Sequence, residues 1–176
     1  PTKSSAASDV YKRQGVGFAP VKPGTEEFLV QLMEGVEDIP GVALNEGVSW
    51  DWESFPEYLD SIGKKNYAMD IGAMIGHGPI RSYVMGMDRC QGKEEASDEE
   101  INEMAKITKE AIEAGALGFS TSRTYLHRDK FGEYVPGTEA TAKEMRKIAN
   151  TIADLGQGTL EIVSDWMDQD IELDWV

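Results

Sequence analysis

Cysteine and histidine, the side chains that hold most protein zinc ions, are scarce in this chain of 176 residues. There is one cysteine, Cys90, and there are two histidines, His77 and His127. A single cysteine excludes an intrachain disulfide framework and fits a reducing, cytoplasmic compartment. Because the chain has no HxH, HExxH or CxxC pattern, the residues by themselves provide no complete zinc site.

Basic residues are the second deficit. The chain has 17 Lys and Arg against 32 Asp and Glu, which gives a formal net charge of -15. Sequence-independent binding of nucleic acid needs clustered cations, and anionic membrane surfaces attract Lys and Arg, so we expect neither partner. No apolar run approaches the length of a membrane span. Hydrophobic residues still make up 40% of the chain, enough for one domain with a real core.

Residues 1–14 (PTKSSAASDVYKRQ) differ from everything that follows them. They have no helical or strand periodicity, and they are basic where the remaining sequence is acidic. We expect a non-native or disordered leader that makes no core contacts. The folded part is then expected within residues 15–176.

Short apolar segments in this part alternate with helical patterns. Three of them are typical of strands: residues 68–75 and 116–121, which we expect to be buried, and residues 159–163. A fourth, residues 15–20, is typical of a strand end or a glycine-bearing loop. Such alternation implies parallel strands joined by right-handed crossovers. The sequence therefore predicts an α/β fold, and the small number of strands points to part of a larger sheet or barrel.

Two capping boxes predict where helices begin. Ser97 stands three residues before Glu100, and Thr141 stands three before Glu144, so we expect each hydroxyl to accept the N3 amide and each glutamate to reach back. Apolar residues then recur at the helical period: Ile101, Met104, Ala105, Thr108, Ala111 and Ile112, and later Met145, Ile148, Ala149, Ile152 and Ala153. Two weaker helical patterns follow Thr25 and Ser54.

Polar side chains stand where two of the expected strands end. The segment 116–121 runs into hydroxyls and an arginine, and the segment 68–75 runs into a histidine between glycines that leave its imidazole uncrowded. Parallel strands gather their carboxyl ends at one edge, where α/β proteins bind ligands. We therefore expect a site for an anionic or amide-bearing small molecule, although each of these segments can also be a strand that simply ends in a polar turn. The substrate-binding candidates are His77, Ser120, Thr121, Ser122 and Arg123.

A long polar loop, residues 124–137, follows the central strand. Loops of this length in a compact domain are often functional, but we expect its histidine, His127, to lie in solvent. No GxSxG elbow supports Ser120 as a hydrolase nucleophile, and there is no phosphate-binding glycine loop of the Walker type. The residues alone therefore identify no catalytic set.

Five segments carry a family resemblance: GVGFAP at 15–20, LMEGVEDIP at 32–40, WDWESFPEYL at 50–59, GHGPIR at 76–81 and GALGFSTS at 115–122. In this order and spacing, they resemble the D-aminoacylase branch of the amidohydrolase superfamily, the N-acyl-D-amino-acid deacylases. The resemblance implies a metal-bearing (β/α)₈ TIM-type barrel with a small β-sandwich beside it. This chain would be a fragment that supplies the second to fifth barrel strands, about half of the barrel.

The resemblance also implies a chemistry for the parent protein. A zinc ion would activate water for attack on the acyl carbonyl of a small N-acyl amino acid, while an aspartate at a strand end moves the proton. The products would be a D-amino acid and a carboxylate.

The family's metal ligands do not fall on this sequence. Its HxH precedes the segment that begins at Gly15, its cysteine ligand falls at Gln14, and the histidine that follows its fifth strand has no counterpart after Val163. The remaining histidine and the catalytic aspartate would lie beyond Val176. The resemblance thus implies a zinc-dependent parent with no catalytic residue and no metal ligand in this fragment, which we expect to be inactive alone.

Two other functions stay open at this stage. One is a hydantoinase-like or dihydroorotase-like cyclic amidohydrolase, which would carry a lysine ligand on the fourth strand, about where Ser120 stands. The other is a non-catalytic acidic α/β interaction domain that folds alone as a stable monomer.

Overall fold

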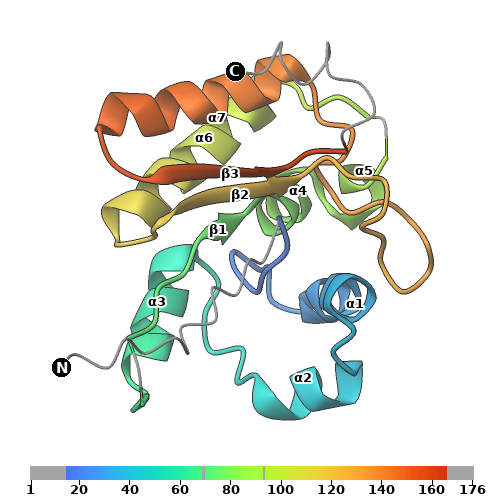
Figure 1. Ribbon diagram of the computed structural model, residues 1–176, viewed down its shortest axis with the longest axis vertical. Helices are drawn as coiled ribbons and strands as arrows, with labels where there is room; N and C mark the ends of the chain where they lie inside the picture. The colour runs from blue at the N-terminus through green and yellow to red at the C-terminus, as the bar shows by residue number, and fades with distance from the viewer. Residues whose placement is uncertain (1–14, 69, 93, 166–176) are drawn as a thin grey trace, which may run out of the picture.

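The computed structural model describes residues 15–68, 70–92 and 94–165. The expected leader, residues 1–14, lies outside this described part of the chain, as do residues 166–176 (Figure 1). No helix in the described part is both long and apolar enough to cross a bilayer.

Three parallel strands form the sheet at the centre of the described part (Figure 1). They are β1 (Ile75–Gly76), β2 (Gly118–Ser122) and β3 (Thr159–Val163), in the order β1-β2-β3. Phe119 of β2 lies opposite Ile75 on one side and Leu160 on the other. Parallel neighbours need crossover connections, and a helix lies between each pair of these strands along the chain. The predicted α/β alternation is confirmed here.

The strand predicted at residues 68–75 is wrong except at its last residue. β1 has only 2 residues, and residues 70–74 lead into it without regular structure. A backbone hydrogen bond from Leu117 N to Ala73 O (2.8 Å) prolongs the pairing. Ile71 is 52% exposed, so the apolar run here is not a fully covered strand. Residues 15–20 form a loop, the second of the two expected conformations.

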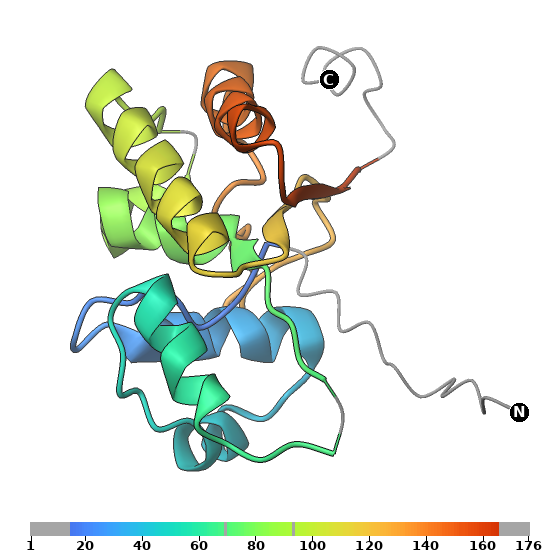
Figure 2. The ribbon, with the colours of Figure 1, turned by 90° about the vertical axis from the view of Figure 1, so that its left-hand side faces the viewer.

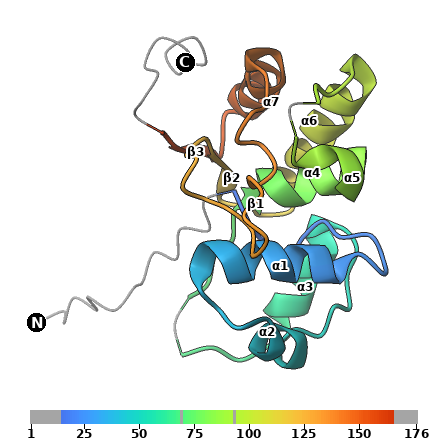
Figure 3. The same cartoon turned by 90° about the vertical axis from the view of Figure 1, so that its right-hand side faces the viewer.

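Seven helices accompany the sheet in the described part: α1 (Glu26–Glu37), α2 (Gly41–Gly47), α3 (Phe55–Gly63), α4 (His77–Met85), α5 (Met87–Cys90), α6 (Asp98–Glu113) and α7 (Ala142–Leu155). α6 and α7 lie side by side on one side of the sheet, and α1, α2 and α3 gather on the other (Figures 1 and 3). α4 and α5 lie beside β1, between the two groups (Figure 2). The sequence did not predict α2, α4 and α5, none of which has a side-chain cap.

The predicted helix starts are mostly confirmed. Ser97 accepts the amide of Glu100 (3.2 Å), whose carboxylate accepts the amide of Ser97 (2.8 Å). Ser54 begins α3 with a second complete capping box. Thr25 precedes α1 but does not cap it with its side chain, because its hydroxyl donates to Lys22 O (2.8 Å) instead.

One hydrophobic core joins the helices on both sides to the sheet. Ile75 and Phe119 in the sheet and Leu32 and Met33 in α1 have no exposed surface. The apolar faces predicted for α6 and α7 are buried as expected at Ile101, Met104, Ala105, Thr108, Ala111, Ile112, Met145, Ile148 and Ile152.

Candidate functional site at the end of the central strand

The predicted site residues of β2 point to opposite faces of the sheet. Side chains alternate along a strand, and Ser120 Oγ accepts the backbone amide of Gly15 (3.2 Å) on one face. Thr121 Oγ1 lies 2.7 Å from His77 Nδ1 on the other face, where the His77 ring also packs 5.2 Å from the ring of Phe119. The structure therefore brings His77 to Thr121 and separates both from Ser120.

His77 is enclosed on all sides. It is the first residue of α4, immediately after β1, and has no exposed surface. A Cβ on Gly137 would lie 2.5 Å from His77 Nδ1, so the loop backbone passes directly over the ring. The expectation of an uncrowded imidazole is thus wrong. The glycines beside His77 serve another purpose, because a Cβ on Gly76 or Gly78 would come within 2.9 Å of backbone oxygens of residues 15 and 16.

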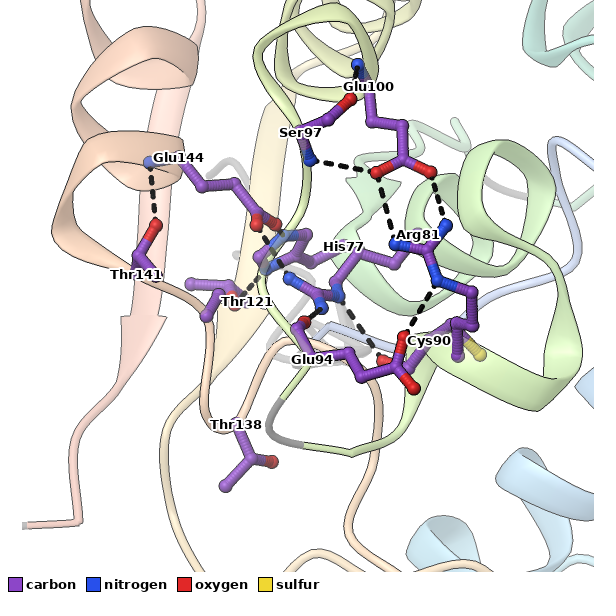
Figure 4. Close-up of polar contacts among 12 residues, drawn as sticks. His77, Arg81, Cys90, Glu94, Ser97, Glu100, Thr121, Thr138, Thr141 and Glu144 are labelled. Atoms are coloured by element: carbon purple, nitrogen blue, oxygen red, sulfur yellow. Dashed lines mark hydrogen bonds and ion pairs between the residues drawn. The ribbon is translucent and has the colours of Figure 1, made fainter.

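The second ring nitrogen of His77 binds a buried carboxylate. Glu144 Oε1 lies 2.6 Å from His77 Nε2, and Glu144 Oε2 accepts from Arg81 Nη1 at 2.6 Å (Figure 4). Arg81 is 1% exposed. Its other nitrogens donate to the backbone oxygens of Cys90 (3.2 Å) and Glu94 (3.0 Å). The Glu144 carboxylate thus links α7 to α4. The Arg81 guanidinium links α4 to the end of α5 and to the segment that follows it.

The charges in this cluster follow from burial and from these contacts. Burial opposes ionisation of Glu144, but the hydrogen bonds from His77 and Arg81 and the positive charge of Arg81 outweigh it and hold the pKa of the carboxyl below its usual value. Burial lowers the pKa of His77, against the opposing effect of Glu144. At neutral pH the cluster therefore contains an ionised carboxylate, a guanidinium and a neutral imidazole.

Ser122 and Arg123 bind the loop that follows β2. Ser122 Oγ lies 2.9 Å from Nδ1 of His127. Arg123 Nη1 donates to the backbone oxygens of Thr138 and of Ala140 (3.1 Å). His127 is half-buried, and burial lowers its pKa, so the expectation that it lies in solvent is wrong.

Loop 124–137 is held by hydrogen bonds within the loop and by contacts with Gln91 and with α1. Asp129 Oδ1 accepts the amides of Phe131 (2.8 Å) and Glu133 (3.0 Å), and Asp129 Oδ2 accepts from Gln91 (2.9 Å). On α1, a Cβ at Gly35 would clash with the backbone of Arg128 and Asp129. The backbone of the loop therefore packs directly against α1 at Gly35.

Four of the five predicted substrate-binding residues have almost no accessible surface. His77, Thr121 and Ser122 are 0% exposed and Ser120 is 2% exposed, while Arg123 is partly exposed. Substrate contact by these side chains stays a prediction, and for the four buried ones it requires the groups that cover them to move.

The described residues do not fit a metal ion. Among them, no group of three or more His, Cys, Asp and Glu side chains could hold one. Both nitrogens of His77 have protein partners. Cys90 is buried, and burial raises the pKa of its thiol to about 12, which disfavours the thiolate that a metal needs. We derive no chemical step through a metal in this part of the chain.

Sequence reasoning missed Glu144 and Arg81 as site residues. Thr141 does accept the amide of Glu144 (3.3 Å) as predicted, but the Glu144 side chain reaches into the core instead of back to the cap. A signal was present: Glu144 stands one helical turn before Ile148 and so shares its buried face. Likewise, Arg81 follows His77 by one turn of α4.

The architecture defines the class of fold. The chain superimposes on a crystal structure of a D-aminoacylase, described as a novel subset of amidohydrolases, with TM-score 0.57 and 24% identity over 84% of this chain. It also superimposes on N-acyl-D-glutamate deacylase from Bordetella bronchiseptica, with TM-score 0.58 and 23% identity over 85% of this chain. The sheet and its helices therefore have the fold of part of a TIM-type barrel, and the predicted partial barrel is confirmed.

Curated sequences give the same relation. D-aminoacylase from Alcaligenes xylosoxydans xylosoxydans is 32% identical over 111 residues, which are 62% of this chain and 20% of that protein. An uncharacterized protein of Mycobacterium tuberculosis is 30% identical over 111 residues, 60% of this chain and 18% of that protein. No protein-family model matches the chain. The predicted resemblance to the D-aminoacylase branch of the amidohydrolases is confirmed.

The chain corresponds to one segment of these longer proteins. It spans 20% or less of these curated relatives and 26% of the two solved chains.

Proposed function

We propose that this chain is a segment of an amidohydrolase that cleaves the amide bond of N-acyl-D-amino acids and releases a D-amino acid and a carboxylate. The observation that carries the proposal is a double match to the chain. A D-aminoacylase resembles it in sequence, and a D-aminoacylase and an N-acyl-D-glutamate deacylase resemble it in fold. The parallel sheet supports the assignment, because barrel enzymes of this class bind substrate at the carboxyl ends of their strands.

A metal requirement is part of the proposal for the whole protein. The Bordetella bronchiseptica deacylase structure holds zinc and a phosphonate that mimics the tetrahedral intermediate of the reaction. Zinc in such enzymes polarises a carbonyl and supplies a nucleophilic water. Because the described residues offer no metal site, the ligands would come from elsewhere in the whole protein.

The contribution of this segment would be one wall of the substrate pocket. Arg123 and His127 are the two partly exposed polar side chains next to the carboxyl end of β2. A guanidinium is suited to a substrate carboxylate, and a half-buried neutral imidazole can donate or accept one hydrogen bond. Ser120 and Ser122 would support this wall from behind.

The test is made on the complete reading frame that contains this chain. Purified protein is incubated with N-acetyl-D- and N-acetyl-L-amino acids, and the release of free amino acid is measured before and after removal of metal by a chelator. We expect release from the D-substrates only, loss of activity on chelation, and recovery with added zinc. Turnover of cyclic diamides in place of N-acyl amino acids would favour a hydantoinase-like enzyme and overturn the proposal.

The 176-residue chain by itself provides a second test. We expect no hydrolysis of N-acyl-D-amino acids, with or without zinc, because the described part holds no metal site. Zinc-stimulated turnover by this chain would contradict the proposal that the metal ligands lie elsewhere in the whole protein. If the complete protein is inactive and the isolated chain unfolds cooperatively as a stable monomer, the interaction-domain alternative is favoured.

A further inference from the structure

The two ends of the connection between β2 and α7 meet at one side chain. Thr121, near the end of β2, contacts His77 Nδ1, and Glu144, in the first turn of α7, contacts Nε2. Between them, the backbone of Gly137 lies against the same ring. His77 therefore contacts both the end of β2, where this connection begins, and the first turn of α7, where it ends (Figure 4).

The proton positions in this chain of contacts follow from the donors and acceptors. An ionised carboxylate can only accept, so Glu144 accepts from His77 Nε2–H. In a neutral imidazole the other nitrogen is then an acceptor, and the Thr121 hydroxyl donates to Nδ1. The second oxygen of Glu144 is held by Arg81, which leaves the carboxylate no freedom to turn away.

We propose that Glu144 is a positioning residue. It fixes His77 in the Nε2–H tautomer and thereby holds the Thr121 hydroxyl and the loop 124–137 at the end of β2. The inference rests on the proposed function in one respect: the loop lies beside substrate only if the chain belongs to the proposed enzyme. The positioning itself depends on contacts within the described residues alone.

The tautomer of His77 is the direct test. Long-range nitrogen–proton NMR spectra of the 176-residue chain distinguish the Nε2–H form, the Nδ1–H form and the imidazolium. We expect the Nε2–H form at neutral pH. A wild-type His77 in the Nδ1–H or imidazolium form would overturn the proposal.

The Glu144→Gln variant makes that test sharper. A carboxamide has one accepting oxygen, which Arg81 would take because Arg81 can only donate. The amide NH₂ must then donate to His77 Nε2, and we expect His77 to switch to the Nδ1–H tautomer. Glu113→Gln on α6, whose side chain is 52% exposed, is the matched control and should leave the spectrum unchanged. An unchanged tautomer in a folded Glu144→Gln variant would contradict the proposal.

Loop position is tested by proteolysis, in case Glu144→Gln does not fold. Trypsin can cleave the loop at the exposed Arg128 and Lys130, and cleavage at Lys106 on α6 reports global opening. Thr121→Val removes the hydroxyl and leaves His77 Nδ1 without a partner, so we expect cleavage in the loop, relative to α6, to rise about tenfold. Thr121→Ser keeps the hydroxyl and should restore protection.

Two outcomes would count against positioning by this route. One is equal loop cleavage in Thr121→Val and Thr121→Ser. The other is an equal rise in Thr151→Val, a control on α7 whose hydroxyl donates within its own helix (Thr151 Oγ1 to Lys147 O, 2.9 Å). These experiments need no enzyme activity, so an inactive complete protein would refute the proposed function and leave this inference standing.

Discussion

Replacing Arg81 with methionine tests how much the buried cluster contributes to stability. Methionine is unbranched and apolar, so the change removes mainly the charge and the donors. Arg81 Nη1 and Glu144 Oε2 are 2.6 Å apart, and the two side chains are 2% and 0% exposed. Removing one partner of such a pair leaves the other as an uncompensated buried charge, which costs about 3–5 kcal/mol. A small domain has roughly 5–15 kcal/mol in total, so the variant should fold with a much lower unfolding midpoint.

A double variant separates the lost charge from lost packing. In Arg81→Met with Glu144→Leu no buried ion remains, and apolar replacement of a buried pair is often neutral or better. His77 Nε2–H loses its acceptor in this variant, at about 1–3 kcal/mol. We therefore expect the double variant to be more stable than Arg81→Met alone, although it carries one more substitution.

Urea unfolding measures both effects. Tryptophan fluorescence and circular dichroism follow the transition, and linear extrapolation gives the free energy of unfolding. The control is Arg89→Met, because the ion pairs of Arg89 with Glu94 and Glu100 involve a side chain that is 41% exposed, and exposed pairs contribute little. If Arg81→Met is no more destabilising than Arg89→Met, the reasoning about the buried charge is refuted.

Three further predictions follow from the same region. The free energy of unfolding should fall as the pH drops below 6.5, the ordinary pKa of histidine, because the unfolded chain binds the proton that buried His77 resists. It should fall again below 4.5, the ordinary value for Glu144, whose pKa is lowered in the folded chain; urea titrations at pH 8, 6 and 4 check both. Gly137→Ala should cost about 2–4 kcal/mol, from its left-handed φ of 102° and its contact with His77, and more than Gly132→Ala, which has a φ of 88° but open space. Cys90, which is 1% exposed, should react with a thiol reagent only when urea unfolds the chain; rapid reaction in the native state would contradict its placement.

Local signals predicted the parts of the fold that depend on nearby residues. Ser97 and Glu100 cap α6 reciprocally, and the residues that form β3 were predicted at both ends. Ser97 and Glu100 lie three positions apart, so the pattern in the chain contains their contact. The apolar run of β3 is also local, although its pairing partners on β2 are distant in the chain. The segment 68–75 failed because pairing depends on a neighbouring strand, and β2 pairs with only its final residue and the one after it.

The candidate site could be predicted only as a set of residue types at strand ends. Which face each side chain takes depends on register, and a shift of one residue exchanges the faces. The sequence could not place Ser120 against Gly15 or Thr121 against His77, because these pairs are 105 and 44 residues apart.

Glu144 is where local and distant interactions compete. Its position three residues after Thr141 favours a capping role, and its position one turn before Ile148 favours burial. In the structure, half of the capping box is present: the backbone amide of Glu144 donates a hydrogen bond to the Thr141 hydroxyl. The Glu144 carboxylate binds His77 and Arg81 instead. Burying a carboxylate is costly unless it is paired and hydrogen-bonded, so this arrangement is stable only because α4 presents a guanidinium and a neutral imidazole at the same point. The sequence pattern of α7 alone therefore cannot decide the role of Glu144, because its partners His77 and Arg81 lie 67 and 63 positions away in the chain.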